Sequence, residues 1–430
     1  MTPILDHLQL LSTTRLGDGV GGGEGLAMHV AADGSRTLFI ASEHAPCDFV
    51  ALDVTDPRGP AVVYRQDLPG PGIRSNNLAI HDDLLAVTRQ VSEKGAPPGG
   101  VELFDISRPR APRSVGFFDA SGGASPGTHF VWLAADGHAY LASGAADFAP
   151  RDPRDRFMLR ILDVTSPARP VEAGRWSLPG LSAEDEQDAP ARPADRLASA
   201  VGASLSAEER AQRRYERDGL CSWDFGFRVH NVTVLPERPD RAYLAHTSAG
   251  AYVFDISERS RPRPVGHLDY ETPLPGAAHT FVPLGRSGFA LLSDETLEEG
   301  AADFPQNVWM VDARIESRPM IVGALDLPWP SAVPPSGRFG AHNLHEYPPG
   351  QGAYRSFDLA ATAMFGLGAA VFDVADPLRP RRVAHFSPGP EDGGPGSGQI
   401  NDVFLDDRGL LYALDRRSDY CFVLELELGR

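Results

Sequence analysis

The sequence is poor in cysteine and contains no long apolar run. Its three cysteines, Cys47, Cys221 and Cys421, are an odd number without short-range spacing, so neither a disulfide framework nor a thiolate metal site is expected. No apolar stretch approaches the ~18 residues of a membrane-spanning helix, and the N-terminus lacks a basic segment followed by an apolar one. We therefore expect a cytoplasmic protein without membrane insertion.

Positive charge is also scarce. The 40 Lys and Arg residues stand against 58 Asp and Glu residues, which gives a formal net charge of −18. Such a field repels phosphate backbones, so no nucleic-acid partner is expected. The sequence also lacks a G-x-S-x-G elbow, a P-loop and an H-E-x-x-H helix, which argues against the nucleophilic, phosphate-binding and zinc-protease chemistry of those motifs.

One pattern repeats through most of the chain. Each copy is an apolar strand ending in Asp, a proline-containing turn and a second short strand. The clearest copies are LFDISRPRAPRSVG (103–116), ILDVTSPARPVEAG (161–174), VFDISERSRPRPVG (253–266) and VFDVADPLRPRRVA (371–384). Two further strand signals precede each copy, and four strands in about 40–50 residues form the blade of a β-propeller. The aspartates, such as Asp105, are expected to bind turn N–H groups.

Six complete blades are expected, and a seventh is incomplete. The complete ones span 24–68, 76–120, 129–179, 230–270, 279–328 and 342–388. The C-terminal repeat supplies only three strands, and segment 8–17 can provide the fourth, which would close the ring and remove exposed edges. The predicted fold class is therefore all-β: a single seven-bladed β-propeller over 1–430, closed by an N-terminal strand.

The segment 180–228 interrupts the repeat between the third and fourth blades. Its part 204–219 is expected to be helical, because Ser206 and Glu209 have capping-box spacing and Gly219 can end the helix. The segment joins an outer strand to the next inner strand, so it lies on the face where the inner strands begin. It is either a lid over the axis or a surface embellishment.

Aromatic residues gather in this segment and in other loops of the same face. A partly apolar substrate pocket around the axis is therefore expected. Its candidate residues are Trp223, Phe225, Phe227, Phe304, Trp329 and Phe339.

The first residues of the inner strands are all polar. In chain order they are Glu24, Asn76, His129, His230, His279, His342 and Asn401. Inner strands of a propeller surround one axis, so these side chains are expected to converge there. Two readings stay open for the four histidines: they bind a metal, or they are structural histidines inherited with the repeat.

Imidazoles without thiolates suit Fe, Zn, Cu or Ni, and Mn is also possible, whereas Mg and Ca require oxygen ligands. Carboxylates and amides are expected to orient the ligands or line the pocket. The candidates are Asn76, Asn401, Asp402, Glu346, Asp294 and Glu295. Glu24 is the candidate catalytic base. His345 has the opposite strand parity to His342, so it is expected to pack within the blade.

The repeated DIS/DVT-x-P-x-x-P element resembles that of the LVIVD-repeat propellers and, more distantly, the selenium-binding-protein group of seven-bladed propellers. The resemblance covers nearly the whole chain and implies the fold. The resemblance to the selenium-binding-protein group also implies that histidines on this scaffold bind a metal, for which that group implicates copper. A four-histidine site on seven blades is similar to that of the carotenoid-cleaving oxygenases, which hold Fe(II) and leave positions open for O₂ and substrate. That family's wider sequence motifs are absent here.

The sequence thus predicts a mononuclear non-haem metalloenzyme. The first expectation is an Fe(II)-dependent oxygenase that uses O₂ on an apolar or aromatic small molecule, with His129, His230, His279 and His342 as ligands. The alternatives are a copper oxidase, a metal Lewis-acid enzyme for hydrolysis, cyclisation or elimination with Glu24 as base, and a non-enzymatic interaction scaffold.

Overall fold

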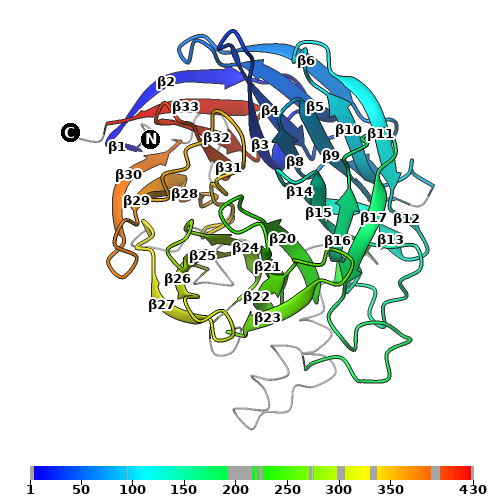
Figure 1. Ribbon diagram of the computed structural model, residues 1–430. Helices are drawn as coiled ribbons and strands as arrows, with labels where there is room; N and C mark the ends of the chain where they lie inside the picture. The colour runs from blue at the N-terminus through cyan, green and yellow to red at the C-terminus, as the bar shows by residue number, and fades with distance from the viewer. Residues whose placement is uncertain are drawn as a thin grey trace.

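The chain folds as an all-β, seven-bladed propeller whose sheets surround one axis (Figure 1). This computed structural model describes residues 4–93, 95–191, 226–270, 274, 276–297, 306–329, 337–388 and 398–427, with the backbone of 216–217 and 220–221. The described residues contain no helix, and thus none long and apolar enough to cross a membrane. The predicted fold class is confirmed.

The first five blades each use strands that are consecutive in the chain. These are β3 (Gly22–Val30), β4 (Arg36–Ser42), β5 (Cys47–Asp53) and β6 (Ala61–Asp67); β7 (Ile73–Arg74), β8 (Leu78–His81), β9 (Leu84–Val91), β10 (Gly100–Asp105) and β11 (Arg113–Asp119); β14 (Thr128–Leu133), β15 (His138–Ser143), β16 (Met158–Asp163) and β17 (Val171–Trp176); β20 (Arg228–Thr233), β21 (Arg241–Thr247), β22 (Gly250–Asp255) and β23 (Arg263–Leu268); and β24 (Ala278–Pro283), β25 (Phe289–Asp294), β26 (Val308–Asp312) and β27 (Met320–Ala324). Their bounds lie close to the repeats predicted from the sequence.

The last two blades combine strands from both ends of the chain. The C-terminal part supplies β28 (Leu359–Ala363), β29 (Ala369–Asp373) and β30 (Arg381–Ser387), then β31 (Ile400–Leu405), β32 (Leu410–Asp415) and β33 (Tyr420–Leu426). On the outside, β2 (Leu8–Arg15) pairs with β33, as predicted, so blue and red strands lie side by side in Figure 1. In addition β1 (Ile4–Asp6) pairs with β30, which the sequence analysis did not anticipate. The N-terminal segment therefore joins two blades.

The innermost segment of the sixth blade is irregular. Residues 342–346 run along β28, where His342 N donates to Ala363 O and His345 N donates to Ala361 O. A single bridge pairs Leu344 with Thr362. The segment therefore takes the inner-strand position expected for it without forming a continuous ladder.

The repeated aspartates hold the turns between the two outer strands of the blades. Asp105 accepts hydrogen bonds from Ser107 N at 3.0 Å and Arg113 Nη2 at 2.9 Å. These bonds lower the pKa of Asp105 to about 2. Asp255 has equivalent partners in Ser257 and Arg263. The predicted structural role of these residues is confirmed.

Segment 180–228 is described only in part. Ser182 bridges to Pro150, and Leu181 is buried in the core, so the beginning of the segment packs against the propeller. The predicted helix over 204–219 lies largely outside the described residues. Its end differs from the prediction, because β18 (Glu216–Arg217) pairs with β19 (Leu220–Cys221). A second short pair, β12 (Ser121–Gly122) and β13 (Ser125–Pro126), lies in another loop.

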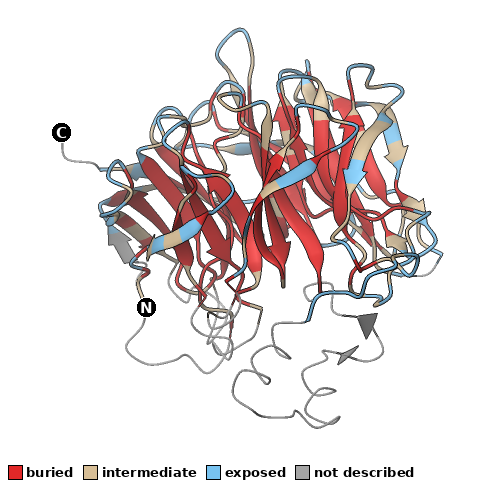
Figure 2. Ribbon diagram, turned by 60° about the horizontal axis from the view of Figure 1, so that its bottom comes forward, coloured by how far each residue is buried: buried red, intermediate tan, exposed pale blue. Residues whose placement is uncertain are grey.

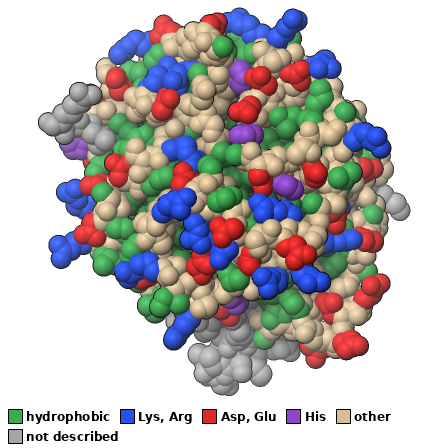
Figure 3. Space-filling model, viewed as in Figure 1, with side chains coloured by type: hydrophobic (Ala, Val, Ile, Leu, Met, Phe, Trp, Pro, Cys, Tyr) green, Lys and Arg blue, Asp and Glu red, His purple; other side chains and the backbone are tan. Residues whose placement is uncertain are grey.

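Buried residues follow the strands of every blade, whereas exposed residues lie mainly in the loops and outer strands (Figure 2). Cys47 and Cys421 are buried and unbonded to each other, as expected for small apolar side chains. On the face in Figure 3, basic and acidic side chains are interspersed. The net negative charge therefore forms no single patch on that face.

Candidate metal centre

A β-bulge aims each histidine of β14, β20 and β24 at the axis. The pairing register shifts at His129 between Thr128 and Phe130, at His279 between Ala278 and Thr280, and across His230 between Val229 and Val232. A bulge adds a residue to one strand and turns its side chain out of the normal alternation. Similar shifts lie at Glu24 in β3 and Asn401 in β31.

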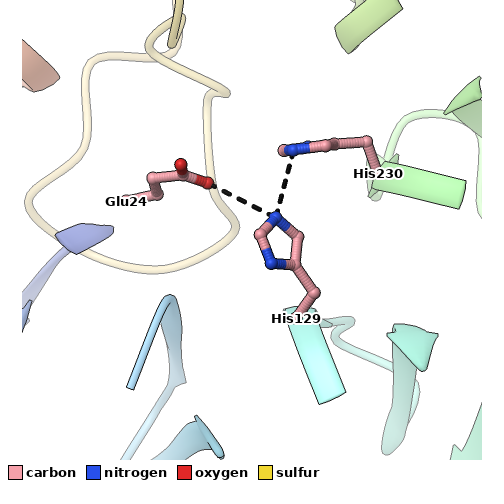
Figure 4. Close-up of side chains that lie close together, drawn as sticks. All are labelled: Glu24, His129 and His230. Atoms are coloured by element: carbon pink, nitrogen blue, oxygen red, sulfur yellow. Dashed lines mark hydrogen bonds and ion pairs between the residues drawn. The ribbon is translucent and has the colours of Figure 1, made fainter. Parts of the chain in front are cut away.

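The four histidines come together around Glu24, as predicted. His129 Nε2 and His230 Nε2 lie 3.1 Å apart, and Figure 4 shows Glu24 pointing at this pair. Glu24 Oε2 lies 3.7 Å from His129 Nε2 and 3.8 Å from His279 Nε2. Glu24 Oε1 lies 3.4 Å from His342 Nε2. Five side chains from five blades thus direct their polar atoms into one small volume.

Glu295, which follows β25 directly, joins this cluster from the other side. Its Oε2 lies 3.9 Å from His230 Nε2 and its Oε1 lies 3.7 Å from His342 Nε2. The Arg338 guanidinium lies 3.2 Å from Glu295 Oε1. Two carboxylates and four imidazoles therefore form the centre.

Each histidine is held through Nδ1, on the side of the ring away from the centre. The contacts are His129 to Gln90 Oε1 at 3.1 Å, His230 to Asn231 Oδ1 at 2.7 Å, His279 to Thr280 Oγ1 at 2.7 Å and His342 to Asn401 O at 2.6 Å. Histidines that bind metals are usually anchored in this way, because the anchor fixes both the tautomer and the ring plane.

The neighbouring groups determine where three of these rings carry their proton. Arg74 Nη2 donates to Gln90 Oε1 at 3.4 Å, so the atom beside His129 Nδ1 is an oxygen and Nδ1 is the donor. Asn231 Nδ2 donates to the Glu346 carboxylate at 2.8 Å, which leaves Asn231 Oδ1 to accept from His230 Nδ1. A backbone carbonyl can only accept, so His342 also donates through Nδ1.

Burial favours the neutral imidazole at His230 and His342. His230, His279 and His342 are at most 1% exposed. Burial, together with the charge of His279, holds the pKa of His230 well below its usual value and lowers that of His342 to about 4. Burial alone would raise the pKa of Glu24, but the neighbouring His279 and His342 outweigh it and hold this pKa well below 4.5. Two neutral imidazoles, those of His230 and His342, therefore lie near an ionised carboxylate.

The donor atoms fit a metal ion. Ligands about 2.1 Å from one ion lie about 3.0–3.4 Å apart when adjacent, close to the spacings around Glu24. His279 Nε2 and His342 Nε2 are buried and have no hydrogen-bond partner among the described residues. Imidazole and carboxylate donors without thiolate suit Fe, Mn, Zn or Cu. These residues could therefore hold a transition-metal ion, and the identity of the cofactor stays a prediction.

The two ring amides lie outside this set of donors. Asn76 Nδ2 donates to Glu43 Oε1 at 3.0 Å. Asn401 Nδ2 donates to the backbone of Gly22 and Gly23, and its main-chain oxygen anchors His342. Their roles are to fix strands and one ligand.

Asp294 also has a structural environment. It accepts hydrogen bonds from Tyr270 Oη at 2.6 Å and Trp309 Nε1 at 2.8 Å. These contacts hold it within its own blade, whereas Glu295 beside it reaches the histidines.

Glu346 and Asp402 line a cavity of about 40 Å³ along the axis, which also contacts Glu24. Its walls include Asn77, Trp132 and Phe404. Burial raises the pKa of Glu346 to about 7 and that of Asp402 well above its usual value. Glu346 reaches the histidines through Asn231, whereas Asp402 accepts from its own neighbour, Val403 N, at 2.8 Å.

The predicted aromatic pocket lies partly outside the described residues. Trp223, Phe225 and Phe304 are not described. Phe227 is buried in the hydrophobic core, and Trp329 and Phe339 pack against that core. Two aromatic residues that sequence reasoning missed lie beside the histidines. Phe365 stacks on His342 with ring centroids 4.4 Å apart, and Phe157 lies 5.8 Å from His129.

His345 packs within the propeller and not at the central cluster, as its position on the opposite side of the strand from His342 predicts. Leu405 N donates to its Nδ1 at 3.2 Å, and its Nε2 donates to Tyr354 O at 2.9 Å. Both ring nitrogens therefore have partners: Nδ1 is bound by β31 of the neighbouring blade, and Nε2 by the loop that leads to β28. This pattern is the opposite of that in His129, His230 and His342, which donate through Nδ1.

Comparisons with known proteins identify the fold only. No protein-family model and no curated protein matches the chain. A solved structure described as the β-propeller domain of Myceliophteria thermophila Cps50 (Swd1) is similar with a TM-score of 0.51 and 10% identity, covering 96% of this chain and 99% of that one. The likeness supports the propeller. The resemblance to the LVIVD-repeat and selenium-binding groups stays a prediction.

Proposed function

We propose that this protein is a metal-dependent enzyme whose metal is held by His129, His230, His279 and His342, beside Glu24. The observation that carries the proposal is the contact between His129 Nε2 and His230 Nε2 at 3.1 Å. Both rings donate through Nδ1, so two lone pairs face each other. Such an arrangement is favourable only with a cation or a proton between the two nitrogens.

We further propose Fe(II) as the metal and oxygenation of a small molecule as the reaction. Bound Fe(II) would supply the binding and activation of O₂. The Phe157 and Phe365 rings, which lie beside His129 and His342, support an apolar or aromatic substrate. Burial of the centre would exclude bulk water from the reaction.

Glu24 is proposed as the group that binds or transfers a proton beside the substrate. Its carboxylate is ionised and lies 3.4–3.8 Å from three of the imidazoles. It also faces the axial cavity, so it contacts both the metal-binding atoms and a space large enough for water.

The same donors also support a copper oxidase or a Lewis-acid reaction in which Glu24 is the base. Nitric oxide distinguishes these from the iron enzyme, because Fe(II) with an open position forms a paramagnetic nitrosyl adduct that Zn does not form. A non-enzymatic interaction scaffold is the remaining alternative. In that case, replacing the central histidines would change stability without removing a metal.

The test is elemental analysis of the protein purified without added metal, followed by spectroscopy with nitric oxide. The proposal requires bound iron and a nitrosyl signal. Copper or zinc in place of iron would support one of the alternative reactions.

A further inference from the structure

The two oxygens of Glu24 face different sets of histidines, since Oε2 lies within 3.8 Å of both His129 Nε2 and His279 Nε2 and Oε1 is the oxygen beside His342. Oε2 lies 3.7 Å from His129 Nε2, whereas Oε1 lies 3.4 Å from His342 Nε2. A carboxylate that bound one ion through one oxygen would need only one of these contacts. The arrangement instead resembles a carboxylate that spans two positions.

Glu295 repeats this arrangement. Its Oε2 faces His230 at 3.9 Å and its Oε1 faces His342 at 3.7 Å. Both carboxylates therefore extend from the His129–His230 side of the cluster to the side of His342.

The donor atoms divide into overlapping groups. One contains Glu24, His129 and His230, and a second contains Glu24, His279 and His342, with ligand atoms in each within 4.8 Å of one another. A third contains His230, His279 and Glu295. Donors around a single ion would lie at most about 4.2 Å apart, twice a metal–ligand bond. In the described part of the chain, however, no such group holds all four histidines.

We propose that the cluster binds two divalent transition-metal ions, one at His129 and His230 and one at His279 and His342, bridged by Glu24. This inference rests on the proposed function, because it requires these side chains to bind metal, and it divides them between two ions. In paired metal sites the ions lie about 3.5–4 Å apart, a distance that the two oxygens of one carboxylate can span. Glu295, which contacts both sides, is the second bridge.

The charges on the donors fit an additional anionic ligand. Glu24 and Glu295 are the carboxylates of the cluster, and the Arg338 guanidinium offsets part of the charge of Glu295. Two divalent ions would therefore retain positive charge. A hydroxide or an anionic group of the substrate would bind between them.

The experiment is metal stoichiometry in the full-length protein. The chain is stripped with a chelator, reloaded with Mn(II), desalted and measured by elemental analysis and electron paramagnetic resonance. We expect about two Mn(II) per chain with a spectrum of exchange-coupled ions. About one per chain overturns this inference and leaves the proposed function intact, whereas none overturns both. Two bound ions without exchange coupling would contradict the claim that Glu24 bridges them.

Variants assign the two positions. His129→Ala and His342→Ala are each expected to retain about one Mn(II) with an uncoupled spectrum. The control, His138→Ala, removes a histidine at the start of β15 that contacts Asp136, and it should keep both ions. Circular dichroism checks that each variant is folded. A folded His129→Ala variant that keeps the coupled pair contradicts the assignment.

Discussion

His129 Nε2 lies 3.1 Å from His230 Nε2, although each ring donates its Nδ1 proton to a side-chain oxygen. The two lone pairs are held face to face by groups outside the centre, Gln90 for one and Asn231 for the other. His345, which donates through Nε2 instead, shows how a histidine of this fold is satisfied without a ligand.

Gln90 should control metal affinity without binding the metal. Gln90→Leu removes the acceptor for His129 Nδ1, so the ring can turn or change tautomer, and the affinity for Zn(II) should fall by about 10–100-fold. Calorimetric titration measures this change. Gln66→Leu is the matched control, since Gln66 contacts Tyr64 on an outer strand, and it should bind Zn(II) like the wild type. Equal affinities in the two variants would contradict the role of Gln90.

Glu346 should make the metal-free protein less stable at alkaline pH. Its pKa is about 7 in the folded protein against 4.5 in an unfolded chain. The folded state therefore holds the proton more tightly, and this contribution to stability is present below pH 4.5 and lost as the pH rises through 7.

Glu346→Gln keeps an oxygen for Asn231 and removes the titration. It should raise the melting temperature at pH 8, by an amount that corresponds to at most about 3 kcal/mol, and change it little at pH 4.5. Calorimetry of metal-free wild type and variant at both pH values tests this. If the melting temperatures of wild type and variant differ by the same amount at pH 8 and at pH 4.5, Glu346 does not titrate as described.

The N-terminal strand should stabilise the ring through its buried residue. Leu8 is 4% exposed and packs with β31 to β33, whereas Gln9 beside it is exposed. Leu8→Ala should lower the free energy of unfolding by about 2–4 kcal/mol, and Gln9→Ala should lower it by less than about 0.5 kcal/mol. Denaturant unfolding measures both. If the free energy of unfolding falls by the same amount in both variants, packing of β2 through Leu8 does not stabilise these blades.

The propeller and the four histidines could be predicted because both follow from the repeat. The Asp-and-proline turn marks each blade, and aligning the blades places His129, His230, His279 and His342 at one register. The bulges at this register do not appear in the pattern of apolar residues. They allow Asn231, next to His230 in sequence, to anchor the same ring.

The partners of His129 and His342 could not be predicted, since they come from other blades. Gln90 lies at the end of β9 and meets His129 only across the gap between blades. Glu295 could be named as a candidate, but its contact with His230 depends on how the chain leaves β25. Asn76 was expected at the centre, but its side-chain amide donates a hydrogen bond to Glu43 instead.

The most direct test of the central claim is the metal content of the protein purified without chelator or added metal. The account predicts at least about one equivalent of a transition metal per chain, lost when His230 and His279 are both replaced by Ala. Less than about a tenth of an equivalent of every transition metal, in folded wild-type protein that also fails to take up Fe(II), Zn(II) or Mn(II), would contradict it.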